Sequence, residues 1–196
     1  MAPFMRYARS LEVNMDVLVI GDGPGGLSAA LFLAKAGKAV TVVGPDESAM
    51  HWARLYNYLG IDMIDGSTFQ ERSRAQVQKL GATLLDGRVE AVENTGEGFV
   101  ATLASGDTLT APTLILSEGK SPKLARSLGC AEGDNGITVD AHGLTSVPGV
   151  FAVGRMVWPT RSQAIISAGD GAKAALHILA QLEGRDVQDW DSPPKE

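Results

Sequence analysis

The sequence predicts an α/β fold in which a parallel sheet is flanked by helices and joined by a small antiparallel β-meander. Three observations predict it. A strand–helix–strand pattern of about 30 residues begins at Asp16, the length that a parallel crossover needs. Short apolar runs separated by turn pairs follow in the middle of the chain, and a long amphipathic helix pattern comes near its end.

Length and composition indicate one globular domain. The chain has 196 residues, of which 44% are hydrophobic and 20% are charged. Its formal charge of -6 argues against nucleic acid as a partner, and no apolar run approaches the roughly 18 residues needed to cross a membrane. The single cysteine, Cys130, excludes an intrachain disulfide and a CxxC redox pair and suits a cytoplasmic protein.

The pattern divides the chain into an N-terminal arm at 1–15, a domain at 16–184 and an acidic C-terminal tail at 185–196. Either Met1 or Met15 is a possible start. We expect the tail, which carries two prolines, to be only partly ordered.

The first half of the domain contains two buried strands and two helices. "VLVI" (17–20) and "AVTVV" (39–43) are the strands, and the apolar spacing between them predicts a helix that ends at Gly37. A second helix is predicted at 67–80, with Ser67 as its cap and Gly81 as its stop. The Lys and Arg residues at 72–79 are interpreted as its solvated face.

The second half begins with the meander. Residues 82–111 alternate apolar runs with turns and lead into a buried strand at 113–116. Residues 117–136 are polar and glycine-bearing and are interpreted as a connection. The strand "VFAVG" (150–154) and a final helix closed by Gly184 complete the domain.

A glycine-rich turn joins the first strand to the first helix. Gly21, Gly23 and Gly26 form G-x-G-x-x-G in the setting that binds dinucleotides. The first glycine permits a tight turn, the second lets a pyrophosphate approach the backbone, and the third lets the helix pack on the strand. The helix N-terminus then favours the anion. The alternative, a glycine turn without a ligand, is the weaker interpretation inside a complete strand–helix–strand unit.

One expected residue is absent. Such sites place an acid for the adenosine ribose at the end of the second strand, where this chain has Gly44. Asp46, two residues later, is either a ribose ligand or a solvated turn residue. No arginine for a 2′-phosphate follows nearby in the sequence.

Four blocks together resemble the FAD-binding domain of low-molecular-weight thioredoxin reductases. They are "VLVIGDGPGGLSAALFLAKAGKAVTVV", "NYLG" (57–60), "TSVPGVFAVG" (145–154) and "SQAIISAGDGAKAALHI" (162–178). In that family an NADPH domain with a CxxC interrupts the FAD domain, and here the interruption would fall at 119–136, where only a short loop fits. The chain is therefore similar to small single-domain bacterial flavoproteins related to thioredoxin reductase, with a Rossmann-like FAD-binding fold.

The resemblance implies a set of FAD contacts and no side chain that acts as a catalyst or metal ligand. The glycine loop would hold the pyrophosphate, the residues after the second strand the adenosine ribose, and Val89 the adenine. Segments from the end of the fourth parallel strand, the "NYLG" block and the last helix would contact the flavin half. The implied residues are Gly21, Asp22, Gly23, Pro24, Gly25, Gly26, Gly44, Pro45, Asp46, Asn57, Tyr58, Val89, Ser117, Gly119, Gly154, Arg155, Gln163 and Ala164.

Three positions depart from the family pattern. Gly44 replaces the ribose-binding Glu, Arg155 replaces an Asp, and Glu118 lies beside the expected cofactor path. Losing two hydrogen bonds to sugar hydroxyls would weaken FAD roughly ten- to hundred-fold. Pairing of Arg155 with a phosphate would offset part of that loss. An aromatic patch of Trp52, Tyr56 and Tyr58 either walls the flavin or fills the domain edge.

The resulting hypothesis is a flavoprotein oxidoreductase that takes electrons from an external donor or a redox partner protein, with a homodimer or a partner covering the flavin. Three alternatives stay open. They are a flavin-holding or sensing module without turnover, a scaffold that has lost FAD, and a site for NAD(H).

Overall fold

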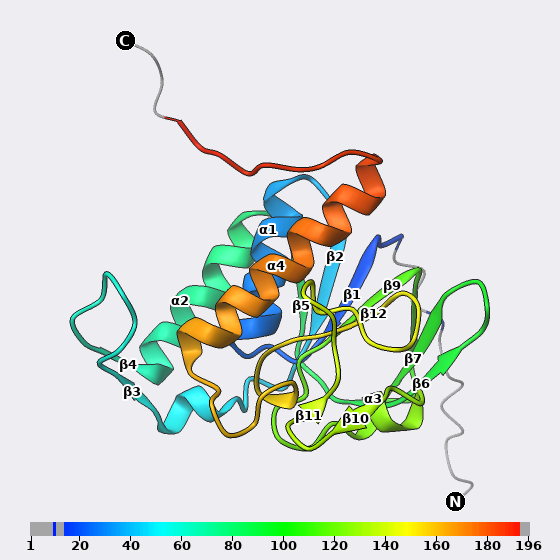
Figure 1. Cartoon of the computed structure of the whole chain (residues 1–196), viewed down its shortest axis with the longest axis horizontal. Helices are drawn as coiled ribbons and strands as arrows, with labels where there is room; N and C mark the ends of the chain where they lie inside the picture. The colour runs from blue at the N-terminus through cyan, green and yellow to red at the C-terminus, as the bar shows by residue number, and fades with distance from the viewer. Residues whose placement is uncertain (1–9, 11–13, 193–196) are drawn as a thin grey trace, which may run out of the picture.

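The computed structural model describes residue 10 and residues 14–192 of the chain. A five-stranded sheet with every pairing parallel lies at its centre, and the strand order is β12-β9-β1-β2-β5. Figure 1 shows three helices against one face of this sheet and a small antiparallel sheet against the other. The five strands are β1 (Val17–Ile20), β2 (Val40–Val43), β5 (Thr83–Leu85), β9 (Thr113–Leu116) and β12 (Val150–Ala152).

The helical layer forms because small residues let its two inner helices approach closely. A Cβ on Gly171 would lie 2.0 Å from the carbonyl oxygen of Gly25, so the two backbones touch where α1 crosses α4. α2 packs beside α1. The bounds are α1 (Pro24–Lys35), α2 (Gly66–Lys79) and α4 (Ala164–Glu183).

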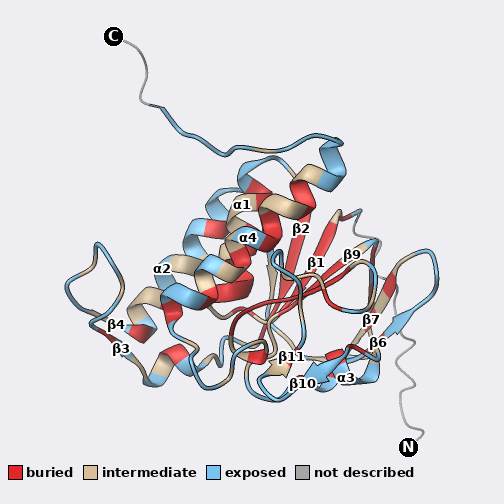
Figure 2. Ribbon diagram, in the orientation of Figure 1, coloured by how far each residue is buried: buried red, intermediate tan, exposed pale blue. Residues whose placement is uncertain are grey.

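Alternation along each strand gives the sheet two separate cores. On β1, Val17 and Val19 face the helices, whereas Leu18 and Ile20 face the meander. The meander completes its core with Phe99 and residues around it, and Figure 2 shows the central strands buried throughout. Its antiparallel strands are β6 (Val89–Asn94), β7 (Phe99–Leu103) and β8 (Thr108–Ala111).

Short elements make up the rest. Two small hairpins and three short helices lie at the end of the sheet where β1 and β2 finish (Figure 1). They are η1 (Ala49–Trp52), β3 (Arg54–Leu55), β4 (Ile64–Asp65), α3 (Lys123–Ser127), β10 (Glu132–Gly133), β11 (Gly136–Ile137) and η2 (Gly154–Met156).

The α/β architecture with its meander is confirmed, and several boundaries differ from prediction. α2 begins at Gly66, and Asp65, not Ser67, is its N-cap. Only glycine fits at this helix start, because a Cβ on Gly66 would lie 1.9 Å from the Met50 carbonyl oxygen. The predicted connection holds the helix α3. The start of the predicted meander was assigned wrongly, because Thr83–Leu85 is the strand β5, which pairs in parallel with β2 at the edge of the central sheet. The strand expected from residue 39 begins at Val40.

The two ends of the chain carry contacts of their own. Met15 is buried in the meander-side core. In the described part of the tail, Asp189 and Asp191 both pair with Lys35 on α1. Most of the predicted arm (1–9 and 11–13) and the last four residues (193–196) lie outside the described residues.

Candidate functional site

The glycine loop between β1 and α1 has the geometry of a phosphate cradle. Gly21 has a φ of 104°, and a Cβ on it would lie 2.2 Å from the Ser117 carbonyl. A Cβ on Gly26 would lie 2.0 Å from the Gly21 carbonyl. A Cβ on Gly23 would meet nothing within 4 Å, because this glycine faces open space. The first and third glycines are thus needed by the protein, whereas the second leaves room for a ligand.

Two helices begin beside this turn without a side-chain cap. Gly23 is the N-cap of α1 and Gln163 is the N-cap of α4, and neither helix start has a side-chain hydrogen bond or an acidic residue in its first turn. The first N–H groups of a helix have no partner inside it and carry a partial positive charge. Both starts therefore present free donors that suit an anionic or electron-rich ligand.

The two starts line one cleft of about 1030 Å³. That volume lies at the upper end of the range of about 300–1,000 Å³ for small-molecule sites and suits a ligand as long as a dinucleotide. Its charged lining is mixed, with Arg88, Lys120, Lys123 and Arg155 against Asp22, Glu47, Glu90 and Glu118.

Most of the sequence-predicted site residues line this cleft together. They are Gly21, Asp22, Gly23, Pro24, Gly25, Pro45, Val89, Ser117, Gly119, Gly154, Arg155, Gln163 and Ala164. The other five, which are Gly26, Gly44, Asp46, Asn57 and Tyr58, lie around it and support its walls. Gly26 closes the glycine loop on Gly21, as described above.

Asp22 occupies the space that a side chain at position 44 would need. A Cβ on Gly44 would lie 2.3 Å from the carboxyl carbon of Asp22 and 2.6 Å from its Cβ. The φ of Gly44 is not positive, so its backbone accepts any residue and the restriction is steric alone. Asp22 in the glycine loop therefore explains why the strand ends in glycine at position 44, since the two side chains would need the same space.

Arg74 on α2 holds the Asp22 carboxylate in place. Its guanidinium pairs with Oδ2 of Asp22 and with Asp86, and its Nε lies 3.9 Å from Asp46. The same Oδ2 accepts the backbone N–H of Asp46 at 3.0 Å. Asp46 has a φ of 55°, and its own carboxylate lies 3.0 Å from His51 Nε2.

Arg74 corrects two expectations. The sequence pattern predicts that Arg74 lies on a solvated helix face, but its side chain is only 14% exposed. No arginine follows Asp46 closely in the sequence, but the fold brings this one beside it. The sequence feature that could have indicated this pairing is the Asp between two loop glycines. An acid that is nearly buried there needs a cation beside it.

Burial raises the pKa of the Asp22 carboxyl, and the nearby Arg74 charge and the Asp46 N–H act in the opposite direction. Asp22 is 3% exposed, so desolvation outweighs the favourable partners.

Arg155 and Glu118 differ in how far they are already engaged. Nε of Arg155 is buried and has no hydrogen-bond partner among the described residues. The Glu118 carboxylate accepts the N–H groups of Leu124 and Ala125 at 2.8 and 3.0 Å, so it serves the start of α3. Burial raises the pKa of Glu118, and these backbone donors oppose the shift. Arg155 thus has a donor still to satisfy, as does the buried hydroxyl of Ser48, which also lines the cleft.

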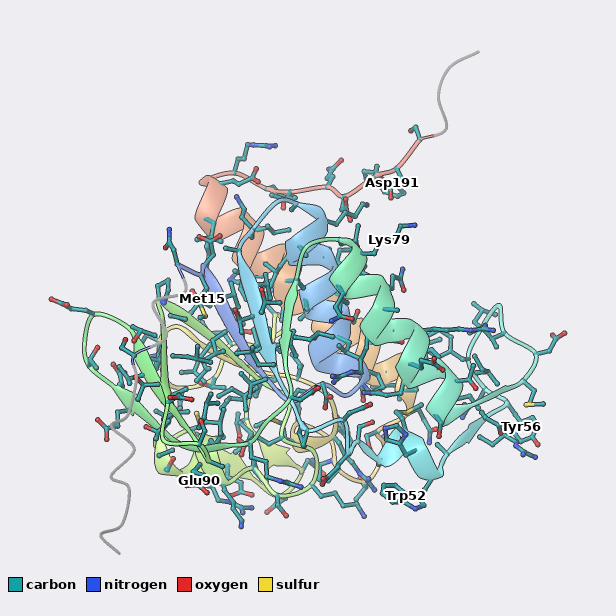
Figure 3. The ribbon with its side chains drawn as sticks, turned by 180° about the vertical axis from the view of Figure 1, so that it is seen from behind. Met15, Trp52, Tyr56, Lys79, Glu90 and Asp191 are labelled. Carbon is teal, nitrogen blue, oxygen red and sulfur yellow. The ribbon has the colours of Figure 1, made fainter. Side chains whose placement is uncertain are left out.

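The "NYLG" block contacts the cleft lining through Asn57 and through Tyr58, which packs against the cluster of Met50, Leu55 and Ala164. Asn57 Nδ2 donates to Oε1 of Gln163 at 3.0 Å, which ties this block to the start of α4. Tyr58 packs on Phe69 and does not line the cleft. Trp52 and Tyr56 are 82% and 67% exposed, and Figure 3 shows both projecting outward. The three aromatic residues therefore do not form one wall of the cleft.

Cys130 lies away from the cleft. Its thiol is 7% exposed and donates to Oγ1 of Thr145 at 3.5 Å, and burial raises its pKa. No group of three His, Cys, Asp or Glu side chains within the described residues could hold a metal ion. In the same part of the chain, no helix is long and apolar enough to span a membrane.

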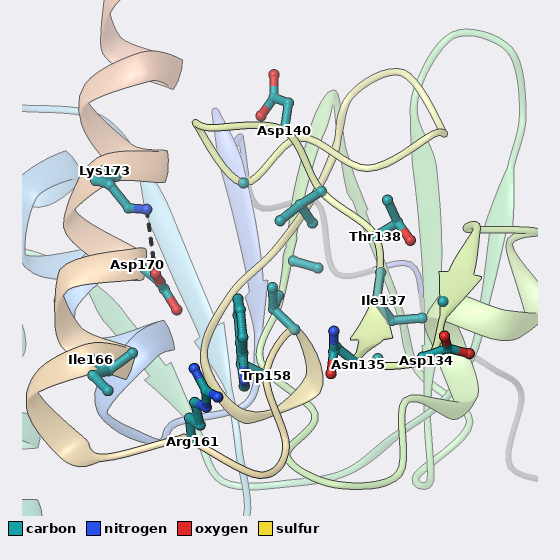
Figure 4. A pocket seen from close by; sticks show the side chains of 16 residues that line it. Asp134, Asn135, Ile137, Thr138, Asp140, Trp158, Arg161, Ile166, Asp170 and Lys173 are labelled. Atoms are coloured by element: carbon teal, nitrogen blue, oxygen red, sulfur yellow. Dashed lines mark ion pairs between the residues drawn. The ribbon is translucent and has the colours of Figure 1, made fainter.

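A second hollow of about 630 Å³ is lined by residues of the β10–β11 hairpin, of the segment after η2 and of α4 (Figure 4). Arg161 lies 5.5 Å from the ring centre of Trp158, and Lys173 pairs with Asp170 at 3.5 Å. It shares no lining residue with the nucleotide-sized cleft.

A parallel sheet with a glycine-rich β1–α1 turn and a second helix start at the same cleft defines a nucleotide-binding domain of the oxidoreductase type. Comparison with known proteins gives the particular family. Residues 63–172, more than half of the chain, match the family described as pyridine nucleotide-disulphide oxidoreductase, and residues 16–54 match an FAD binding domain. The chain belongs to the pyridine nucleotide-disulphide oxidoreductase family.

Individual relatives agree with this assignment. The chain is 33% identical to an NADH dehydrogenase of Bacillus subtilis over 85% of its own length and 31% of the relative's. It is 33% identical to a thioredoxin reductase of Streptomyces coelicolor over 53% of its own length and 34% of the relative's. It thus spans about a third of these relatives.

The fold is shared with solved structures. An atypical thioredoxin reductase from Desulfovibrio vulgaris Hildenborough superposes with a TM-score of 0.78 at 19% identity, over 87% of this chain and 99% of that one. The resemblance to thioredoxin-reductase-like FAD domains is therefore confirmed at the level of fold and family.

Proposed function

We propose that the cleft binds FAD and that the protein is a flavin-dependent oxidoreductase which receives electrons from an external donor. The observation that carries the proposal is the meeting of two uncapped helix starts, at Gly23 and Gln163, on one dinucleotide-sized cleft. A pyrophosphate suits the first start because Gly23 faces open space. The electron-rich edge of a flavin suits the second.

The residues of the cleft fit such a cofactor. Arg155 offers a buried, unsatisfied donor beside Gly154, which suits a phosphate oxygen. Gly154 itself has a φ of 71°, and a Cβ on it would lie 3.3 Å from the Ser167 side chain, so glycine suits this position. The bound flavin would supply the redox chemistry, while these residues bind it, orient it and stabilise negative charge.

Two features of the chain support an external source of electrons. Between Ser117 and Gly136 the described chain holds only the five-residue α3 and the strand β10. The single cysteine cannot form a dithiol. Electrons would then come from free NAD(P)H, a redox partner protein or a small reductant. We further infer that a second copy or a partner covers the flavin face, and that the site of action is the cytoplasm.

The first experiment is the visible spectrum of the purified protein. We expect flavin bands near 450 nm and the release of FAD, identified by mass, on heating. A colourless protein that takes up no added FAD would contradict the proposal and favour a scaffold that has lost its ligand. Release of NAD(H) would indicate the alternative cofactor.

Stopped-flow reduction separates an enzyme from a sensing module. We expect NADH, NADPH or a protein donor to bleach the flavin fast enough for turnover. Bound FAD that none of these donors reduces would indicate a flavin-holding module. Light scattering of the loaded protein measures whether it is a dimer, and a monomer with an open flavin face would contradict the covering inference.

A further inference from the structure

The geometry points to Asp22 as the carboxylate that binds the adenosine ribose, transferred from the end of β2 into the glycine loop. The inference rests on the proposed binding of FAD. It assigns to one loop side chain a role that such sites usually give to the residue at the position of Gly44.

The first argument is spatial. The Asp22 carboxylate lies where a side chain on residue 44 would begin, with Oδ1 at 2.5 Å and Cγ at 2.3 Å from the Cβ position of Gly44. A carboxylate thus stands at the end of β2 although the strand itself ends in glycine. Asp22 also lines the cleft, whereas Gly44 does not.

The second argument concerns the two carboxylate oxygens. Arg74 and the Asp46 N–H both bind Oδ2. Among the described residues, no other residue donates a hydrogen bond to Oδ1. This leaves one oxygen of a clamped carboxylate as an acceptor for a sugar hydroxyl, and the clamp fixes its direction.

The third argument is charge. Asp22, Asp46 and Asp86 surround the single cation Arg74, so the cluster carries an excess of negative charge. Such surroundings suit the neutral hydroxyls of a ribose and disfavour a 2′-phosphate. The arginine beside Asp46 therefore supports the carboxylate and does not indicate an NADP-type site.

The direct test removes the hydroxyl and the carboxylate separately. We would measure dissociation constants of FAD and of its 2′-deoxy- and 3′-deoxyadenosine analogues for the wild type and Asp22→Ala. For the wild type, we expect at least one analogue to bind about tenfold more weakly than FAD. For Asp22→Ala, that analogue and FAD should bind nearly equally, because no side-chain oxygen remains to accept a hydrogen bond from the ribose.

The control is Asp86→Asn. It also removes an ion pair of Arg74, but Asp86 does not line the cleft, so full sensitivity to the analogues should remain. Equal loss of affinity for an analogue in the wild type and Asp22→Ala would overturn the inference and leave FAD binding intact. A wild type that binds no FAD would overturn the proposed function as well.

An exchange of the two residues gives an independent test. Gly44→Asp alone should bind FAD poorly, since its Cβ collides with Asp22. Asp22→Gly/Gly44→Asp has the same composition and returns the acid to the strand end, so it should regain most of the affinity. Glycine is needed at 22, because the Asp22 Cβ itself lies within 2.6 Å of the new side chain. Normal binding by Gly44→Asp alone would contradict the spatial argument.

Discussion

At the scale of single residues, the cleft depends on a few groups whose partners come from distant parts of the chain. Asp22 and Gly44 are 22 positions apart and occupy one site, and Arg74 comes from a third element. A nearly buried carboxylate without a cation is costly, so Asp22 and Arg74 depend on each other.

Replacing Arg74 by Met should lower the free energy of unfolding by about 3 kcal/mol, because Asp22 then loses its charge partner inside the protein. Urea unfolding monitored by circular dichroism measures the change. Arg72→Met on the exposed face of the same helix is the control and should stay within about 0.5 kcal/mol of the wild type. Equal effects of the two changes would contradict the role given to Arg74.

The raised pKa of Asp22 sets a direction for pH dependence. The folded protein takes up this proton at a higher pH than the unfolded chain, whose Asp pKa is about 3.9. Relative to Asp22→Asn, the wild type should therefore gain stability as the pH falls through the folded pKa toward about 4, and lose it as the pH rises. Unfolding free energies of both proteins between pH 7 and pH 4 give this slope, and a slope of the opposite sign would be inconsistent with desolvation as the main cause.

At the scale of elements, the β1–α1 turn separates what the fold needs from what a ligand needs. A side chain at Gly21 or Gly26 would collide with a backbone carbonyl of the protein, whereas a side chain at Gly23 would meet no protein atom within 4 Å. The same turn therefore gives a prediction in which folding and binding respond to different substitutions.

Gly26→Ala should destabilise the protein, because its Cβ meets the Gly21 carbonyl at 2.0 Å. Gly23→Ala should leave the stability of the cofactor-free protein nearly unchanged, since its φ of -72° suits alanine and no atom lies near. It should still weaken FAD by about tenfold or more, because the methyl group occupies the path of the pyrophosphate. Thermal unfolding and FAD titration of both variants test the separation, which fails if Gly23→Ala binds FAD normally.

At the scale of the whole molecule, one sheet joins two cores. The helix-side core and the meander-side core use alternate residues of the same strands, so neither can persist without the sheet. The cleft lies at the end of this sheet, where loops from both layers meet.

Phe99→Ala in the meander and Ile178→Ala on α4 should each lower the unfolding free energy, by about 3–5 and 2–5 kcal/mol, since both side chains are fully buried. Because the sheet couples the two layers, each variant should keep one cooperative transition that far-ultraviolet and near-ultraviolet signals report together. Two separate transitions in either variant would show that the layers unfold independently.

The sequence by itself determined the first strand–helix–strand unit, the glycine turn, most of the meander and the last helix, because these features depend on local periodicity and on glycines close together in the chain. It did not separate β5 from the meander, because three residues are too short a run to show which strand they pair with. Most of the site residues that it predicted line one cleft, since the resembling blocks lie at the ends of consecutive elements. The carboxylate of Asp22 beside Gly44, its clamp by Arg74 and the unsatisfied Nε of Arg155 were decided only by the tertiary structure. Steric exclusion, ion pairing and burial join residues far apart in sequence, and no local pattern records which of them will meet.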